Sequence, residues 1–183
     1  MKRALVLVAD GSEEMEAVTV VDILRRAKIE VVVAGLKEGP ITGSRGVRLI
    51  PDTVLEGQDL SQFDALVLPG GNGGTHAFEE DARVLQLVRA AATRPMLLAA
   101  VCAAPRVLLR AGVLTGKHVT SYPGALQPTD PSYHYREQAV VVDGRLITSR
   151  GPGTALDFAL RIVEELLGAA ARQAVEVPLV RAQ

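Results

Sequence analysis

Short apolar runs alternate with longer amphipathic segments along most of this chain, and this alternation limits the possible folds more than any other sequence feature. Runs of four to six residues rich in Val, Leu and Ala are typical of buried strands, and the segments between them have helical spacing. The order strand, helix, strand predicts a doubly wound α/β fold, with a mostly parallel sheet and helices on both faces. The expected strands are residues 4–9, 30–35, 65–68 and 96–101, and the expected helices are residues 15–27, 81–92 and 154–167.

The remaining segments complete a single domain over residues 1–183. Residues 37–64 are rich in Gly, Pro and Asp, and we expect a β-hairpin there around residues 47–50. Residues 139–142 and 145–148 are expected to form two strands joined by a tight turn. A chain of 183 residues buries roughly 70% of its unfolded surface, and no repeat or linker divides it.

Charge and cysteine content exclude several classes of protein. The net charge of -1 gives no electrostatic reason for binding nucleic acid or an anionic membrane, so small molecules or proteins are the expected partners. One cysteine excludes an internal disulfide, and three histidines offer no zinc-type spacing. We expect no membrane span, no metal and a reducing, cytoplasmic environment.

The single cysteine, Cys102, stands where an apolar run breaks into a helix-like segment with a proline in its first turn, Pro105. A sharp turn from strand to helix would project the thiol, and the N–H groups of the helix start would lower its pKa. The alternative is that Cys102 is a small buried hydrophobic residue, which is the commonest role of a lone cysteine in an apolar stretch.

Other polar groups follow the ends of the predicted parallel strands, which meet in one crevice. Glu16 lies in the opening turn of the first helix, where its alternative role is to complement the helix dipole. The glycines of residues 70–74 match no phosphate-binding motif, so we expect their N–H groups to approach a reacting oxygen. Arg150 follows the last strand, either as an anion-binding residue or in a turn that Thr154 caps.

Four segments, taken in order, resemble the DJ-1/PfpI superfamily and are most similar to its DJ-1/YajL branch. The resemblance implies a flavodoxin-like, Rossmann-like sandwich with a cysteine nucleophile elbow. It also implies a homodimer built partly on the first helix, with no organic cofactor or metal. The segments are residues 10–16, 68–71, 100–105 and 148–154, and residues 177–180 resemble the family's C-terminal tail.

The resemblance also implies roles for individual residues. Cys102 matches the reactive cysteine, and Glu16 matches the glutamate that hydrogen-bonds it. Gly71 and Ala103 match positions whose N–H groups face the sulfur, and Arg45 matches an arginine that reaches the site from the partner subunit. Because an ionised carboxylate would repel the thiolate, we predict that Glu16 has a raised pKa and is protonated when the thiolate forms.

One position departs from the family pattern. Tyr122 stands where many members have a histidine, which argues against a Cys-His-acid triad. His118 lies four residues earlier and would need an unusual backbone path to the thiol, and His76 and His134 match no catalytic position. Ala103 stands where the protease-like branch has histidine, which argues against peptidase activity.

The resemblance implies chemistry on reactive dicarbonyls. One expected activity is a glutathione-independent glyoxalase that converts methylglyoxal to lactate, and a related one is a deglycase that acts on dicarbonyl adducts of proteins. A different class of function is a peroxide sensor or redox-regulated chaperone that works through oxidation of Cys102. A binding module with a vestigial site is a third possibility, and the sequence leaves all three open.

Overall fold

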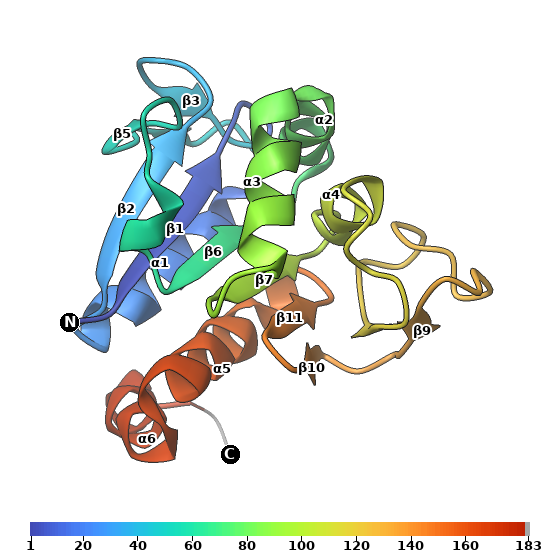
Figure 1. Cartoon of the computed structure of the whole chain (residues 1–183). Coiled ribbons are helices and arrows are strands. Elements are labelled where there is room, and N and C mark those ends of the chain that lie inside the picture. Colours follow the sequence, from blue (N-terminus) through green and yellow to red (C-terminus); the bar gives the residue numbers. More distant parts are fainter. Residues whose placement is uncertain (182–183) are drawn as a thin grey trace.

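The computed structural model describes residues 1–181 and is built on one seven-stranded sheet (Figure 1). All neighbouring strands in this sheet are parallel except the first pair in the order given next, which forms an antiparallel hairpin at one edge. The strands, in spatial order, are β10 (Val140–Asp143), β11 (Leu146–Ser149), β7 (Leu97–Val101), β6 (Ala65–Leu68), β1 (Arg3–Val8), β2 (Glu30–Gly35) and β5 (Thr53–Val54).

The five central parallel strands have the order of a flavodoxin-like fold. Numbered along the chain, β2, β1, β6, β7 and β11 lie in the order 2-1-3-4-5. The direction of winding reverses between β1 and β6, and ligands of such sheets bind outside the carboxyl ends of the strands at this reversal. The predicted fold class is therefore confirmed, and it indicates where a site should lie.

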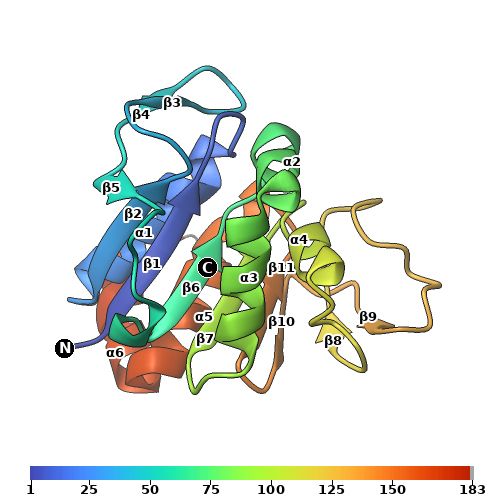
Figure 2. The same cartoon turned by 45° about the horizontal axis from the view of Figure 1, so that its top comes forward.

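Helices cover both faces of the sheet (Figure 2). Along β1, Leu5 and Leu7 pack on the face covered by α2, α3 and α4, while Ala4 and Val6 pack on the face covered by α1 and α5. Strands buried on both faces are apolar at every position, which explains the continuous apolar runs. The helices are α1 (Glu14–Arg26), α2 (Asn72–Glu80), α3 (Ala82–Ala92), α4 (Pro105–Arg110), α5 (Ala155–Leu167) and α6 (Ala169–Glu176).

Two short sheets lie outside the main one. The hairpin expected in the irregular region is present as β3 (Ile41–Thr42) and β4 (Arg48–Leu49). A second pair, β8 (His118–Val119) and β9 (His134–Tyr135), is parallel and was not expected from the sequence. The last strand of the main sheet, β5, was also not expected, because a strand of two residues has too little periodicity to stand out.

Residues 72–74 of the glycine-rich segment begin α2, a helix that the sequence did not predict. Glycine disfavours helices, but tertiary packing requires it here. A Cβ on Gly74 would lie 2.5 Å from the hydroxyl oxygen of Ser12, and one on Gly11 would lie 2.7 Å from Cα of Gly73. The glycines let the first turn of α2 pack against the loop that follows β1.

The C-terminal segment packs partly against its own chain. In α6, Val175 is buried in the same core as α1 and α5, whereas Val177 and Val180 beyond the helix are 69% and 88% exposed. These last two apolar side chains are therefore not covered by the core of their own chain. Among residues 1–181, every helix is too short or too polar to span a bilayer.

Candidate active site

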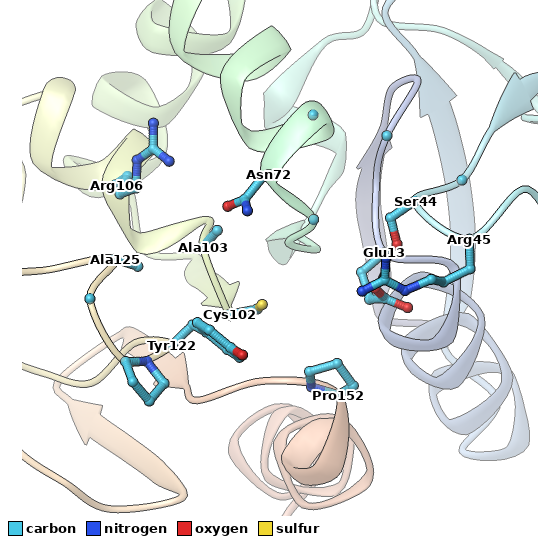
Figure 3. Close-up of a pocket in the computed structure, with 16 residues that line it drawn as sticks. Glu13, Ser44, Arg45, Asn72, Cys102, Ala103, Arg106, Tyr122, Ala125 and Pro152 are labelled. Carbon is cyan, nitrogen blue, oxygen red and sulfur yellow. Dashed lines mark hydrogen bonds between the residues drawn. The ribbon is translucent and has the colours of Figure 1, made fainter.

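The loops after β1, β6 and β7 and the loop after β8 enclose a cavity of about 700 Å³ at the carboxyl ends of the strands (Figure 3). The hairpin of β3 and β4 closes one side through its connecting loop. The cavity is lined by Gly11, Glu13, Gly43, Ser44, Arg45, Gly71, Asn72, Gly73, Cys102, Ala103, Arg106, Tyr122, Pro123, Gly124, Ala125 and Pro152. It lies at the reversal of winding that the sheet topology indicates.

Cys102 forms a strained elbow between β7 and α4. Its φ of +64° lies in the left-handed region, which costs a side-chain-bearing residue roughly 1–2 kcal/mol. Both backbone polar groups are bonded, because the Cys102 N–H donates to Ser149 O (3.0 Å) and its carbonyl accepts from the Tyr122 N–H (2.8 Å). Pro105 opens α4, as the sequence predicts. Such strain is typical of functional sites, and here it turns a side chain that is 9% exposed toward the cavity.

Glu16 is fully buried in the first turn of α1, and Gly70 lies between its carboxyl group and Cys102. The Gly70 N–H donates to Glu16 Oε2 (2.7 Å), while Glu16 Oε1 is buried without a hydrogen-bond partner in the described structure. A Cβ on Gly70 would lie 2.5 Å from Cβ of Cys102 and 2.9 Å from Glu16 Oε2. Only glycine fits at this position, because any side chain would collide with both groups, and its absence lets the carboxyl and the thiol lie close together.

The Glu16 carboxyl and the Cys102 thiol are electrostatically coupled. Burial raises the pKa of Glu16 from 4.5 to about 7, which agrees with the predicted direction. Burial, together with the charge of ionised Glu16, raises the pKa of the Cys102 thiol to about 12. The expected lowering of the thiol pKa is therefore wrong while Glu16 is ionised. The two groups titrate as a pair, and between these two values they hold one proton between them.

Two backbone N–H groups act on the sulfur of Cys102. The N–H groups of Gly71 and Ala103 hydrogen-bond Cys102 and act to lower its pKa, although less strongly than burial and Glu16 raise it. Gly71 has a φ of +84°, and a Cβ there would lie 2.2 Å from the carbonyl oxygen of Gly11. The same donors can stabilise negative charge on an oxygen bound beside the sulfur.

The first turn of α1 positions the loop that carries Arg45. The Glu14 carboxylate accepts hydrogen bonds from the backbone N–H groups of Arg45 (2.8 Å) and Val47 (3.2 Å). The Ser44 hydroxyl donates to Glu13 (2.6 Å). Arg45 is exposed and lines the cavity of its own chain, and its reach into the site of a partner subunit stays a prediction.

Not every predicted residue reaches the cavity. Arg150 is absent from the cavity lining, and its neighbourhood matches the alternative of a capped turn, because the Thr154 hydroxyl accepts from the Gly151 N–H (3.0 Å). The structure therefore gives no support for anion binding by Arg150. His118 stacks on His134 with ring centroids 4.8 Å apart, away from the thiol as expected.

Arg106 and Asn72 line the cavity but were not expected from the sequence. Arg106 lies in the first turn of α4 and forms a two-point ion pair with the buried carboxylate of Glu79, with Nε donating to Oε1 at 3.1 Å. A side chain four residues after Cys102, just inside a predicted helix, points back toward the elbow. The helical spacing could therefore have predicted that Arg106 lines the cavity. Its partner, 27 residues away, had no sequence signal.

In residues 1–181, no three side chains of His, Cys, Asp or Glu cluster as metal ligands. The described site instead consists of a strained cysteine at a strand-to-helix elbow, a buried carboxyl beside it and backbone N–H groups around the sulfur. Together with the flavodoxin-like sheet, these features define a class of α/β proteins with a cysteine at a strand-to-helix elbow.

Comparison with known proteins identifies the family within this class. The chain belongs to the DJ-1/PfpI family, whose model matches residues 2–165. It is 50% identical over 169 residues to protein dj-1beta of Drosophila melanogaster, which covers 91% of this chain and 90% of that protein. The crystal structure of Drosophila melanogaster DJ-1beta has a TM-score of 0.94 at 48% identity and covers 100% of this chain and 99% of that one.

A second relative has a name that states an activity. The chain is 35% identical over 168 residues to glutathione-independent glyoxalase DJR-1.2 of Caenorhabditis elegans, covering 91% of this chain and 90% of that protein. The family and the fold expected from the sequence are thus confirmed.

Proposed function

We propose that this protein is a cysteine-dependent, glutathione-independent glyoxalase that converts methylglyoxal to lactate. The observation that carries the proposal is a coupled pair: the Cys102 thiol lines the cavity, and the Glu16 carboxyl is buried behind it, next to Gly70. A glyoxalase needs a nucleophile and a group that moves a proton between adjacent carbons, and this pair supplies both. The relative from Caenorhabditis elegans that is named as such an enzyme supports the proposal.

In the first step, ionised Glu16 accepts the thiol proton while the sulfur attacks the aldehyde carbon of methylglyoxal. A carbon–sulfur bond forms, and the electron pair of the carbonyl moves onto its oxygen. The N–H groups of Gly71 and Ala103 stabilise that oxygen, which then takes the proton from Glu16. The product is a hemithioacetal on Cys102, and Glu16 is again ionised. A carboxyl pKa of about 7 suits this exchange near neutral pH.

In the second step, Glu16 removes the proton from the former aldehyde carbon, and the electron pair forms an enediolate. Protonation of the neighbouring carbon by Glu16, with transfer of the hydroxyl proton to the second oxygen, gives a lactoyl thioester on Cys102. Water hydrolyses the thioester to lactate and the free thiol. The sum is methylglyoxal plus water giving lactate and a proton, so no other reactant is needed.

The related deglycase activity is part of the same proposal. The cavity of about 700 Å³ is larger than methylglyoxal requires and leaves room for a dicarbonyl adduct on a protein side chain. Small dicarbonyls and glycated proteins are therefore the proposed substrates, in a reducing cytoplasm.

We also propose the homodimer that the resemblance implies. Met15 and Val18 on α1 are 58% and 50% exposed, and Ile50 beyond β4 is 82% exposed. A second copy packed on α1 would cover such apolar side chains.

A redox role is the second candidate, favoured by the N–H groups around Cys102, which suit a sulfinate as well as an alkoxide. A peroxide sensor or redox-regulated chaperone would use this oxidation. The thiol pKa of about 12 weakens this candidate, because the thiolate is the form that reacts with peroxide. The glyoxalase avoids the difficulty because Glu16 takes the thiol proton during the attack.

Lactate formation from methylglyoxal without glutathione tests the proposal. The wild type should form lactate. In Cys102→Ser and in Glu16→Gln, kcat should fall at least about 100-fold, as expected for loss of a nucleophile or a general base. Equal slow rates in all three proteins would remove the glyoxalase proposal and favour the redox role. Retained activity in Cys102→Ser alone would show that the chemistry does not pass through the thiol.

A further inference from the structure

Tyr122 is held at the edge of the cavity by a tight turn. The Ala125 N–H donates to the Tyr122 carbonyl (2.9 Å), with Pro123 and Gly124 between them. Gly124 has a φ of +83°, and proline followed by such a glycine is the sequence of a type II turn. The Tyr122 N–H also donates to the Cys102 carbonyl (2.8 Å). The tyrosine backbone is therefore fixed directly to the nucleophile elbow.

The Tyr122 hydroxyl differs from the two other tyrosine hydroxyls of the chain. Tyr133 donates to Gln127 O (2.9 Å) and Tyr135 donates to Ser121 O (3.3 Å), so both are used within the fold. Within residues 1–181 the Tyr122 hydroxyl has no such partner, and the residue is 51% exposed where it lines the cavity. Figure 3 shows its side chain extending toward the same part of the cavity as the Cys102 sulfur.

The Tyr122 ring lies against Gly151 in the loop after β11. A Cβ on Gly151 would lie 3.3 Å from Cδ2 of Tyr122, so the glycine leaves the ring room to lie against the loop after β11. A phenol on a fixed backbone presents its hydroxyl with little loss of side-chain freedom, because a tyrosine has only two side-chain torsions. The hydroxyl is thus ready to bond a ligand on Cys102.

We propose that Tyr122 is a positioning residue that donates a hydrogen bond to the second oxygen of a dicarbonyl bound to Cys102. This inference rests on the proposed glyoxalase function and specifies its substrate class, an aldehyde with a carbonyl on the adjacent carbon. The second oxygen lies one carbon farther from the sulfur than the oxygen that Gly71 and Ala103 serve. Negative charge reaches it only when the enediolate forms, so the bond strengthens after the thiol has already added.

This timing determines which kinetic quantity changes. A hydrogen bond that strengthens in the transition state affects kcat, whereas one that is equal in substrate and transition state affects KM alone. Removing the hydroxyl should therefore lower kcat and leave the addition of the thiol to electrophiles unchanged. The expected loss is about three- to tenfold, the range for one neutral hydrogen bond.

The test compares Tyr122→Phe with the wild type and with Tyr133→Phe, which removes a hydroxyl that lies outside the cavity lining. Lactate formation from methylglyoxal gives kcat and KM, and the rate of alkylation of Cys102 by iodoacetamide reports on the elbow itself. We expect kcat to fall three- to tenfold in Tyr122→Phe only, with the same alkylation rate in all three proteins.

Each other result counts against the inference. Equal kcat in Tyr122→Phe and wild type overturns it while leaving the glyoxalase proposal intact. A parallel fall in alkylation and kcat shows that the ring merely supports the elbow. If wild-type protein alkylates normally but forms no lactate, the proposed function itself fails, and the role of Tyr122 fails with it.

Discussion

Replacing Glu16 by glutamine should make the protein more stable at alkaline pH while removing its activity. Burial raises the pKa of this carboxyl from 4.5 to about 7, so the folded state binds its proton more tightly than the unfolded chain does. The stabilisation from the protonated carboxyl is complete below pH 4.5 and is lost as the pH rises through about 7. At 1.36 kcal/mol for each pKa unit, the loss is about 3 kcal/mol.

Glutamine cannot ionise, and its carbonyl oxygen can still accept the Gly70 N–H that now bonds Glu16. The free energies of unfolding of Glu16→Gln and wild type should therefore be similar at pH 4, and the variant should be about 3 kcal/mol more stable at pH 8. Other titrating groups are common to both proteins and cancel in the difference.

Urea unfolding at the two pH values measures this difference. Glu38→Gln is the matched control, because it makes the same substitution at an exposed glutamate outside the site. A Glu16→Gln difference that does not change between pH 4 and pH 8 would refute the reasoning, because the carboxyl would then carry no penalty for ionisation.

Three further predictions concern the site and the core. Because turnover requires ionised Glu16, kcat/KM of the wild type should rise with pH around an apparent pKa of about 7, and a rate independent of pH from 5 to 9 would contradict this. Gly71→Ala places a Cβ 2.2 Å from the carbonyl oxygen of Gly11 at a φ of +84°, so the free energy of unfolding measured in urea should fall by about 4 kcal/mol. An unchanged midpoint of urea unfolding would argue against this packing. Phe158→Ala removes a fully buried side chain from α5 and should lower the free energy of unfolding by about 4 kcal/mol in the same assay, while the rate of Cys102 alkylation in the folded protein stays the same. A decrease below about 1 kcal/mol would mean that neighbouring side chains fill the cavity.

The elbow was predictable because its causes are local. An apolar run that stops at Cys102, followed by a proline in a helical first turn, is visible within ten residues of sequence. The place of Glu16 beside it follows from sheet topology, since groups after parallel strands meet at one edge. Its raised pKa was predictable in direction from burial alone.

Other features depend on contacts between distant residues. The helical course of α2 follows from close packing of its glycines on the loop after β1, which propensity does not reveal. The pKa of Cys102 depends on the balance of burial and Glu16 against two N–H groups, and reasoning from the helix start alone gave the wrong sign. Arg106 needed its partner Glu79, and the sequence offered no sign of that pairing.

The central claim is that the Glu16 carboxyl holds and moves the proton at Cys102. The most direct test is a titration of the carboxyl resonances by NMR in protein labelled with carbon-13 at the side-chain carboxyls of glutamate. The resonance missing from Glu16→Gln identifies the group. A midpoint of about 7 in the wild type is the predicted result, and a midpoint at the ordinary value of 4.5 would contradict the account.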